Sequence, residues 1–119
     1  NAVKHFAHHN VGKRRLHDKP KISEVNACRP WLVAEVTHVK PAILVAMGAT
    51  AALAIFGKGF SITKERGEFR VTEYADKTIA TFHPSALLRA LAVDKESAAR
   101  MRAQFVDDLK KVVAALKRP

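Results

Sequence analysis

Residues 41–57, PAILVAMGATAALAIFG, are the stretch that decides the fold. Positions 42–48 form a continuous apolar run without polar alternation, which is typical of a strand covered on both faces in a parallel sheet. Residues 49–56 follow at once and predict a short apolar helix that Gly57 ends. A strand, a glycine and a helix in direct succession indicate an α/β protein with crossover connections.

Amphipathic helices are predicted on both sides of this unit. Ser23 is a candidate cap for a helix that begins near Glu24, with Pro30 tightening or kinking an early turn. Its predicted buried face is Val25, Cys28, Leu32, Val36 and Val39. A second helix is predicted from Asp94 onward, and its buried stripe is Ala98, Met101, Phe105, Leu109, Val112, Val113 and Leu116.

Further strands and one long loop complete the predicted architecture. Residues 1–3 read as the tail of a buried strand, and 6–22 read as a loop without periodicity. Two more strands are expected at 68–74 and 77–84, joined by a turn at 75–76. The predicted fold is therefore α/β. It has three layers, α/β/α, and the middle layer is a mostly parallel sheet.

The composition limits the functional classes. With 119 residues, 48% of them apolar, the chain has room for one core. No apolar run is long enough to span a bilayer, and a single cysteine excludes an intrachain disulfide framework. We expect a cytoplasmic monomer with no membrane partner. The net charge of +10 favours a polyanionic partner, most commonly nucleic acid, over a merely basic surface.

Polar residues gather where the predicted strands end, which is where open α/β sheets bind ligands. They are Asn1, the segment 48–50 and the segment 83–89. In the last of these, His83 ends a strand, Ser85 suits a phosphate, and Leu87 and Leu88 beside Arg89 resemble the apolar wedges that enter a DNA stack. The alternative is that both leucines are core contacts of a short helix and His83 is an ordinary strand-end residue.

Two other clusters have candidate chemistry. Lys13, Arg14 and Arg15 can neutralise phosphates, and His17 can act as acid, base or nucleophile. The alternative for this basic run is a solvated surface.

His5 and Cys28 could be two ligands of a metal or iron–sulfur site. The alternative for Cys28 is a small buried hydrophobic residue.

Five stretches in this order carry a family resemblance: NAVKH (1–5), GKRRLH (12–17), EVNACRPWLVAE (24–35), ILVAMGATAA (43–52) and FHPSALLR (82–89). Together they resemble the C-terminal part of a family 4 uracil-DNA glycosylase. The KRRLH insert is similar to that of the UdgX branch. The resemblance covers essentially the whole chain and implies uracil-containing DNA as the substrate, with single strands preferred.

The resemblance implies a role for each candidate residue. Asn1 would read the uracil edge, and His83 would donate to uracil O2 and stabilise the departing base. Ser85 and the residues after it would hold phosphate and help to extrude the base. His17 would bond to the deoxyribose C1′ after base loss, giving a covalent protein–DNA adduct, while Arg15 and its neighbours hold that loop. The alternatives are a hydrolytic glycosylase that turns over and a non-catalytic DNA-binding fragment.

The resemblance also implies a [4Fe–4S] cluster with His5 and Cys28 among its ligands. Residues 1–119 would then be the C-terminal portion of a single uracil-DNA glycosylase-like domain. In that family the preceding portion holds a Gly-rich motif with an acidic residue, an aromatic that stacks on uracil, and two further cluster cysteines. We expect these parts to lie before Asn1.

Overall fold

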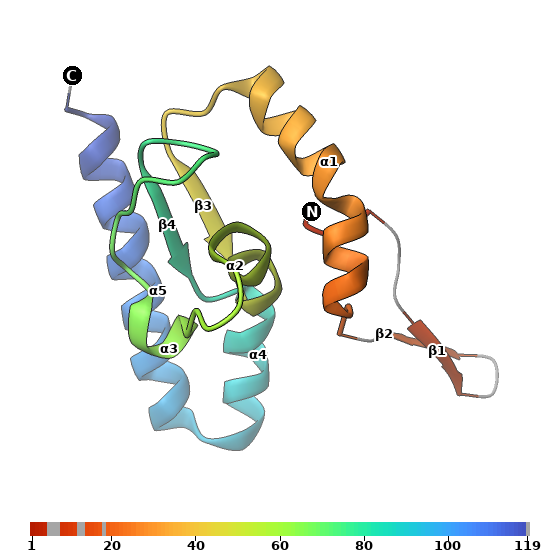
Figure 1. Ribbon diagram of the computed structural model, residues 1–119. Helices are drawn as coiled ribbons and strands as arrows, with labels where there is room; N and C mark the ends of the chain where they lie inside the picture. Colours follow the sequence, from red (N-terminus) through yellow and green to blue (C-terminus); the bar gives the residue numbers. More distant parts are fainter. Residues whose placement is uncertain (5–7, 12–13, 18, 119) are drawn as a thin grey trace.

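The computed structural model describes residues 1–4, 8–11, 14–17 and 19–118, with the backbone alone for 8–11 and 14–17 (Figure 1). The elements in this part of the chain are β1 (His8–Val11), β2 (Arg14–His17), α1 (Ile22–Val39), β3 (Leu44–Met47), α2 (Ala49–Phe56), α3 (Ile62–Glu65), β4 (Thr78–Thr81), α4 (Pro84–Val93) and α5 (Lys95–Leu116).

The parallel pair β3–β4 forms the centre of the molecule. Its register runs from Leu44 opposite Thr78 to Met47 opposite Thr81, and all four residues of β4 are buried. Ala46, Ala52 and Ala80 form a core of small side chains. These small residues allow α2 to approach β3 closely. The predicted strand within 42–48 and the predicted helix at 49–56 are therefore confirmed.

Helices flank this pair on two sides. In Figure 1, α5 runs along one side of the strands, while α2 and then α1 lie on the other. α4 and α5 form an antiparallel hairpin around Asp94, whose carboxylate accepts from the backbone N–H groups of Glu96 (3.2 Å) and Ser97 (3.3 Å). The α/β class is confirmed, and the larger parallel sheet stays a prediction.

Two predicted strands are wrong. Residues 1–4 are coil and bend. Residues 68–74 make only an isolated antiparallel bridge between Arg70 and Thr78. The side chain of Thr72 accepts from the backbone N–H groups of Tyr74 (3.2 Å) and Ala75 (3.3 Å), so the chain turns where a ladder would need those donors.

The predicted long loop at 6–22 is also wrong in part. Within it, β1 and β2 pair as an antiparallel hairpin, with His8 opposite His17 and Val11 opposite Arg14. α1 then begins at Ile22 with Lys21 as its cap, so the helix starts before the cap predicted at Ser23.

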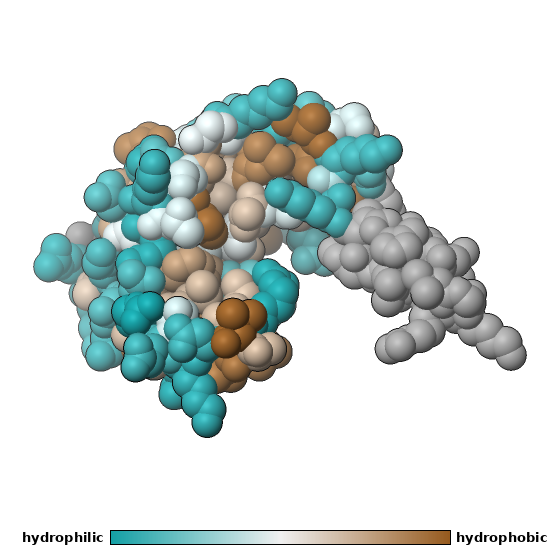
Figure 2. All heavy atoms as spheres, turned by 90° about the horizontal axis from the view of Figure 1, so that it is seen from below, coloured by the Kyte–Doolittle hydropathy of each residue, from teal (hydrophilic) through white to brown (hydrophobic). Residues whose placement is uncertain are grey.

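The predicted inward faces of the two long helices are partly correct, but the core extends less far along these helices than predicted. Val25, Cys28 and Ala98 are buried, but Val39, Val113 and Leu116 are exposed. Periodicity identifies the inward face of a helix but not how far along the helix the core extends. Apolar residues are also exposed at the α4 end of the molecule, where Figure 2, seen from below, shows them among hydrophilic neighbours.

Candidate functional site

The carboxyl ends of β3 and β4 meet at a glycine and a histidine. Gly48 follows β3, and its backbone N–H donates to the carbonyl of Thr81 at the end of β4 (2.8 Å). Its φ is +96°, and a Cβ at this position would lie 3.0 Å from the Cβ of His83. A side chain at position 48 would therefore be strained and would press on His83.

The first turn of α4 fixes the imidazole of His83. The backbone N–H of Ser85 donates to Nδ1 (3.1 Å), and the Ser85 hydroxyl lies 2.9 Å from the same nitrogen. Pro84, at the first helical position, has no N–H to compete. A backbone N–H can only donate, so Nδ1 acts as the acceptor and the neutral ring carries its proton on Nε2. The exposed ring thus has an N–H donor available for a ligand.

Ser85 connects this histidine to a cation. Arg89 Nη1 donates to Ser85 Oγ (3.3 Å), one helical turn along α4. Leu87 is half-buried, whereas Leu88 is 69% exposed. The segment forms the start of the helix α4, as the alternative of a short helix predicted. The alternative of two core leucines is wrong for Leu88, whose side chain is open to solvent.

The N-terminal segment is attached to α1 (Figure 1). The backbone N–H of Lys4 donates to Cys28 Sγ (3.4 Å), and Lys4 Nζ pairs with Glu35 (2.5 Å). This pair raises the pKa of Lys4 and lowers the pKa of Glu35. Asn1, just ahead of this anchor, is exposed.

The other sequence-predicted residues are described in part or not at all. His5 and Lys13 lie outside the described residues. The backbones of Arg14, Arg15 and His17 belong to β2, where Arg15 pairs with Asn10. The structure thus brings together Gly48, His83, Ser85 and Arg89, and leaves the relation of the basic run to them a prediction.

Sequence reasoning missed a buried ion pair beside the site. Asp108 of α5 is 1% exposed, and Arg66 Nη1 donates to both of its oxygens (2.8 and 3.0 Å). The hydroxyl of Thr81 also donates to Asp108 (2.7 Å). The sequence does carry a signal for it. Asp108 lies three residues after Phe105 and four before Val112, so it falls on the predicted buried face of this helix.

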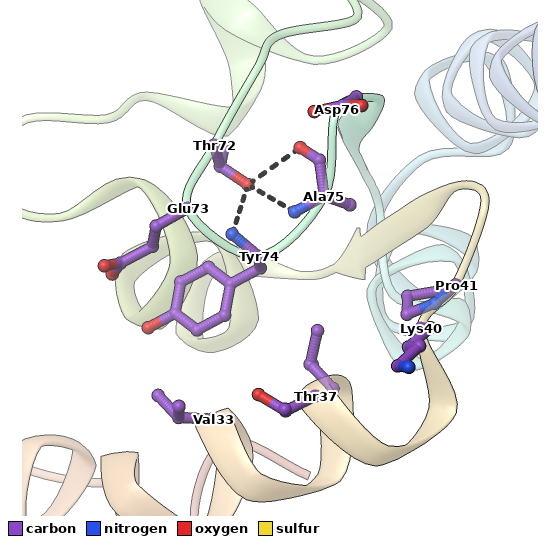
Figure 3. A pocket seen from close by; sticks show the side chains of 10 residues that line it. Val33, Thr37, Lys40, Pro41, Thr72, Glu73, Tyr74, Ala75 and Asp76 are labelled. Atoms are coloured by element: carbon purple, nitrogen blue, oxygen red, sulfur yellow. Dashed lines mark hydrogen bonds between the residues drawn. The ribbon is translucent and has the colours of Figure 1, made fainter.

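A cavity of about 450 Å³ lies at the opposite end of the strands (Figure 3). Val33 and Thr37 of α1 face Tyr74 across it. Its other walls include residues 40–41, which precede β3, and 75–76, which precede β4. Because open α/β sheets bind ligands at the carboxyl ends of their strands, this cavity is not the candidate site.

The described residues hold at most part of a metal site. Within the described ranges, no three His, Cys, Asp or Glu side chains lie close enough to hold a metal ion. Cys28 is buried and its sulfur accepts the backbone N–H of Lys4, so one sulfur that could serve as a ligand is in place. No helix in the part that the structure describes is long and apolar enough to cross a membrane.

Comparison with known proteins places the chain in a family. The model of the uracil DNA glycosylase superfamily matches residues 1–110. The chain is 46% identical over 72 residues to a type-4 uracil-DNA glycosylase of Thermotoga maritima, covering 59% of the chain and 37% of that protein. It is 38% identical over 76 residues to a type-4 uracil-DNA glycosylase of Sulfurisphaera tokodaii, covering 58% and 34%. The matched region is about a third of the length of these relatives. The chain belongs to the uracil DNA glycosylase superfamily.

Proposed function

We propose that the full-length gene product containing this chain excises uracil from DNA, with single strands preferred. The proposal is supported by the family and by the type-4 uracil-DNA glycosylases that the chain resembles. The observation that carries it is the orientation of His83. Its Nδ1 is occupied by Ser85, and its Nε2–H is available at the carboxyl end of β4.

This orientation suits the chemistry of base loss. Breaking the bond between C1′ and N1 leaves the electron pair on uracil, where the negative charge spreads to the carbonyl oxygens O2 and O4. An Nε2–H aimed at O2 strengthens its hydrogen bond as that charge develops, so it stabilises the transition state more than the substrate. Ser85 holds the tautomer in advance, so no proton has to move first. Asn1 would donate to O4 and accept from N3–H, which cytosine cannot match.

Replacing His83 tests this role directly. His83→Ala should lower the single-turnover rate of uracil release on the order of 10²–10³-fold, the usual cost of removing one oxyanion donor. Affinity for DNA should change little. His38→Ala, at an exposed position near the end of α1, is the matched control and should keep the wild-type rate. An undiminished rate in His83→Ala would contradict the assignment.

Contacts with DNA are proposed for the start of α4 and for the basic run. Ser85 and Arg89 would face phosphate, and the exposed Leu88, with Leu87 beside it, would enter the stack as the base is extruded. Lys13, Arg14 and Arg15 would neutralise further phosphates, as the net charge of +10 favours.

For the UdgX-like insert, we propose that His17 traps the sugar. The glycosidic electron pair leaves with uracil, and a lone pair of the imidazole forms the new bond to C1′. The alkylated ring, now an imidazolium, gives up its one N–H proton, and the uracil anion takes up a proton, so the step balances. His17→Ser should abolish the band that resists denaturation while uracil release survives. Hydrolytic turnover remains the alternative, and DNA binding without chemistry is the second alternative.

An iron–sulfur cluster is proposed with Cys28 as one ligand and His5 as another. Cys28 fits, because its sulfur is buried and accepts the N–H of Lys4, the residue before His5. The remaining ligands would come from residues outside this chain. The cluster would serve as a cross-link that ties the N-terminal segment to α1.

The remaining proposals concern the extent of the domain, the oligomeric state and the location of the protein. We propose that residues 1–119 are the C-terminal portion of one domain, whose three-layer sheet other residues complete. We further propose that the protein acts as a monomer in the cytoplasm.

A further inference from the structure

We propose that Asp108 is a positioning residue that holds His83 in its working orientation through Thr81. This inference rests on the proposed function for its kinetic readout, but its geometry stands on contacts that the proposal for uracil excision does not use.

The coupling path is short and continuous. Asp108 accepts the hydroxyl of Thr81 at 2.7 Å, two residues before His83. The carbonyl of Thr81 in turn accepts the backbone N–H of Gly48 at 2.8 Å. Gly48 lies against the Cβ of His83. A displacement of Thr81 would therefore reach the imidazole by two routes. One is the backbone from Thr81 to His83, and the other is Gly48, which bonds to Thr81 and lies against His83.

The carboxylate is itself held from the other side. Gly67 packs so closely that a Cβ there would lie 2.5 Å from Asp108 Oδ1. The N–H of Gly67 donates to the carbonyl of Ala80 in β4 (2.9 Å), and Lys111 of α5 donates to the carbonyl of Gly67 (2.8 Å). The turn at 66–67 thus joins α5 to β4 at the level of Asp108.

Stability alone gives a weak reason for this arrangement. Removing a charged pair from water is costly, and well-packed apolar side chains often stabilise a core as well or better. The pair is also incompletely satisfied, because Arg66 Nε is buried and has no hydrogen-bond partner among the residues described. A directional contact at the end of the strand that carries the histidine is what apolar residues could not supply.

Thr81 offers the sharpest test in the full-length protein. Thr81→Val removes the hydroxyl that Asp108 accepts and keeps a similar shape. It should lower the single-turnover rate on the order of a hundredfold, as expected for a positioning error of about 1 Å. Affinity for uracil-containing DNA should stay near the wild-type value. Thr81→Ser restores the hydroxyl and should restore the rate.

Asp108→Asn is the second variant, in case Thr81→Val does not fold. Asp107→Asn, an exposed neighbour on α5, is its matched control. Imidazole ¹⁵N NMR should show His83 protonated on Nε2 alone in the wild type. In Thr81→Val or Asp108→Asn the two ring signals should move toward each other as the tautomers mix. Thermal unfolding of every variant shows whether the fold is retained.

The outcomes separate this inference from the proposed function. Rate loss with serine rescue and mixed tautomers in folded variants supports the positioning role. Wild-type rates and unchanged ring signals, or a lower Tm alone, would overturn it. If the wild type releases no uracil, the proposed function fails, and the ring signals alone then decide whether Asp108 positions His83.

Discussion

The backbone of Gly48 supports the side chain of His83: a Cβ at position 48 would lie 3.0 Å from the Cβ of the histidine. Gly48 directly follows β3, His83 lies two residues after the end of the parallel strand β4, and the N–H of Gly48 donates to the carbonyl of Thr81, the last residue of β4. The glycine therefore sets how closely the two strand ends approach, and with it the place of the imidazole.

Gly48→Ala should lower both stability and uracil release. A non-glycine residue at φ +96° costs roughly 1–3 kcal/mol of unfolding free energy, and the new methyl group also displaces His83. Gly57→Ala is the matched control, because Gly57 has φ +88° but, apart from its two chain neighbours, none of the described residues has an atom within 4 Å of the place that its new methyl group would take. It should lose stability by a similar amount and keep the rate of the remaining folded protein. Equal rates in the two variants would contradict a role for Gly48 in placing His83.

Sequence patterns predicted the central unit of the fold because local and tertiary preferences agree there. The apolar run before Gly48 and the helix after it were located to within a few residues. The predicted strand at 68–74 failed because β-branched and aromatic residues favour a strand only where a partner ladder exists. The side chain of Thr72 instead accepts hydrogen bonds from the backbone N–H groups of Tyr74 and Ala75.

The candidate site was predictable in part for similar reasons. His83, Ser85 and Arg89 are close in sequence, so their contacts on one helical turn could be anticipated. Asp108 could not be connected to Thr81 in the same way. Their contact spans 27 positions and depends on how α5 docks against β4, which no local pattern encodes.

Neutralising the basic run should weaken DNA binding without regard to uracil. Arg15→Ala should flatten the slope of log K against log salt by about 0.7 for single strands if one phosphate contact is lost. Lys13→Ala and Arg14→Ala should act alike, and Arg15→Ala should in addition lower adduct yield. Arg102→Ala, at an exposed position on α5, is the control for loss of one charge. Unchanged slopes in all three variants would show that the basic run is only a solvated surface without phosphate contacts.

Cys28→Ala should remove iron if Cys28 is a cluster ligand. Purified full-length protein should be brown and contain iron, and the variant should lose iron and unfold at a lower temperature, since cluster binding is coupled to folding. Iron analysis and the visible absorption spectrum measure this. A colourless wild type with full activity would show instead that Cys28 is a packed hydrophobic residue.

The cap of α5 should make stability depend on pH. The Ser97 hydroxyl and the backbone N–H of Glu96 lower the pKa of Asp94 below its ordinary value of 3.8. Because the folded-state pKa is the lower one, its stabilisation is fully present above 3.8 and is lost as the pH falls through the folded value. Asp94→Ala should therefore lower Tm at neutral pH, and the difference from wild type should shrink in acid. A Tm difference independent of pH would contradict this.

The most direct test of uracil excision is a denaturing gel of the full-length protein incubated with single-stranded DNA that contains one uracil, beside the same strand with thymine. We predict that only the uracil strand changes. It should give a protein–DNA band that resists denaturation if His17 traps the sugar, or an alkali-labile abasic product if water does. A uracil strand that stays intact under alkali and forms no adduct, although the protein binds it, would contradict the account.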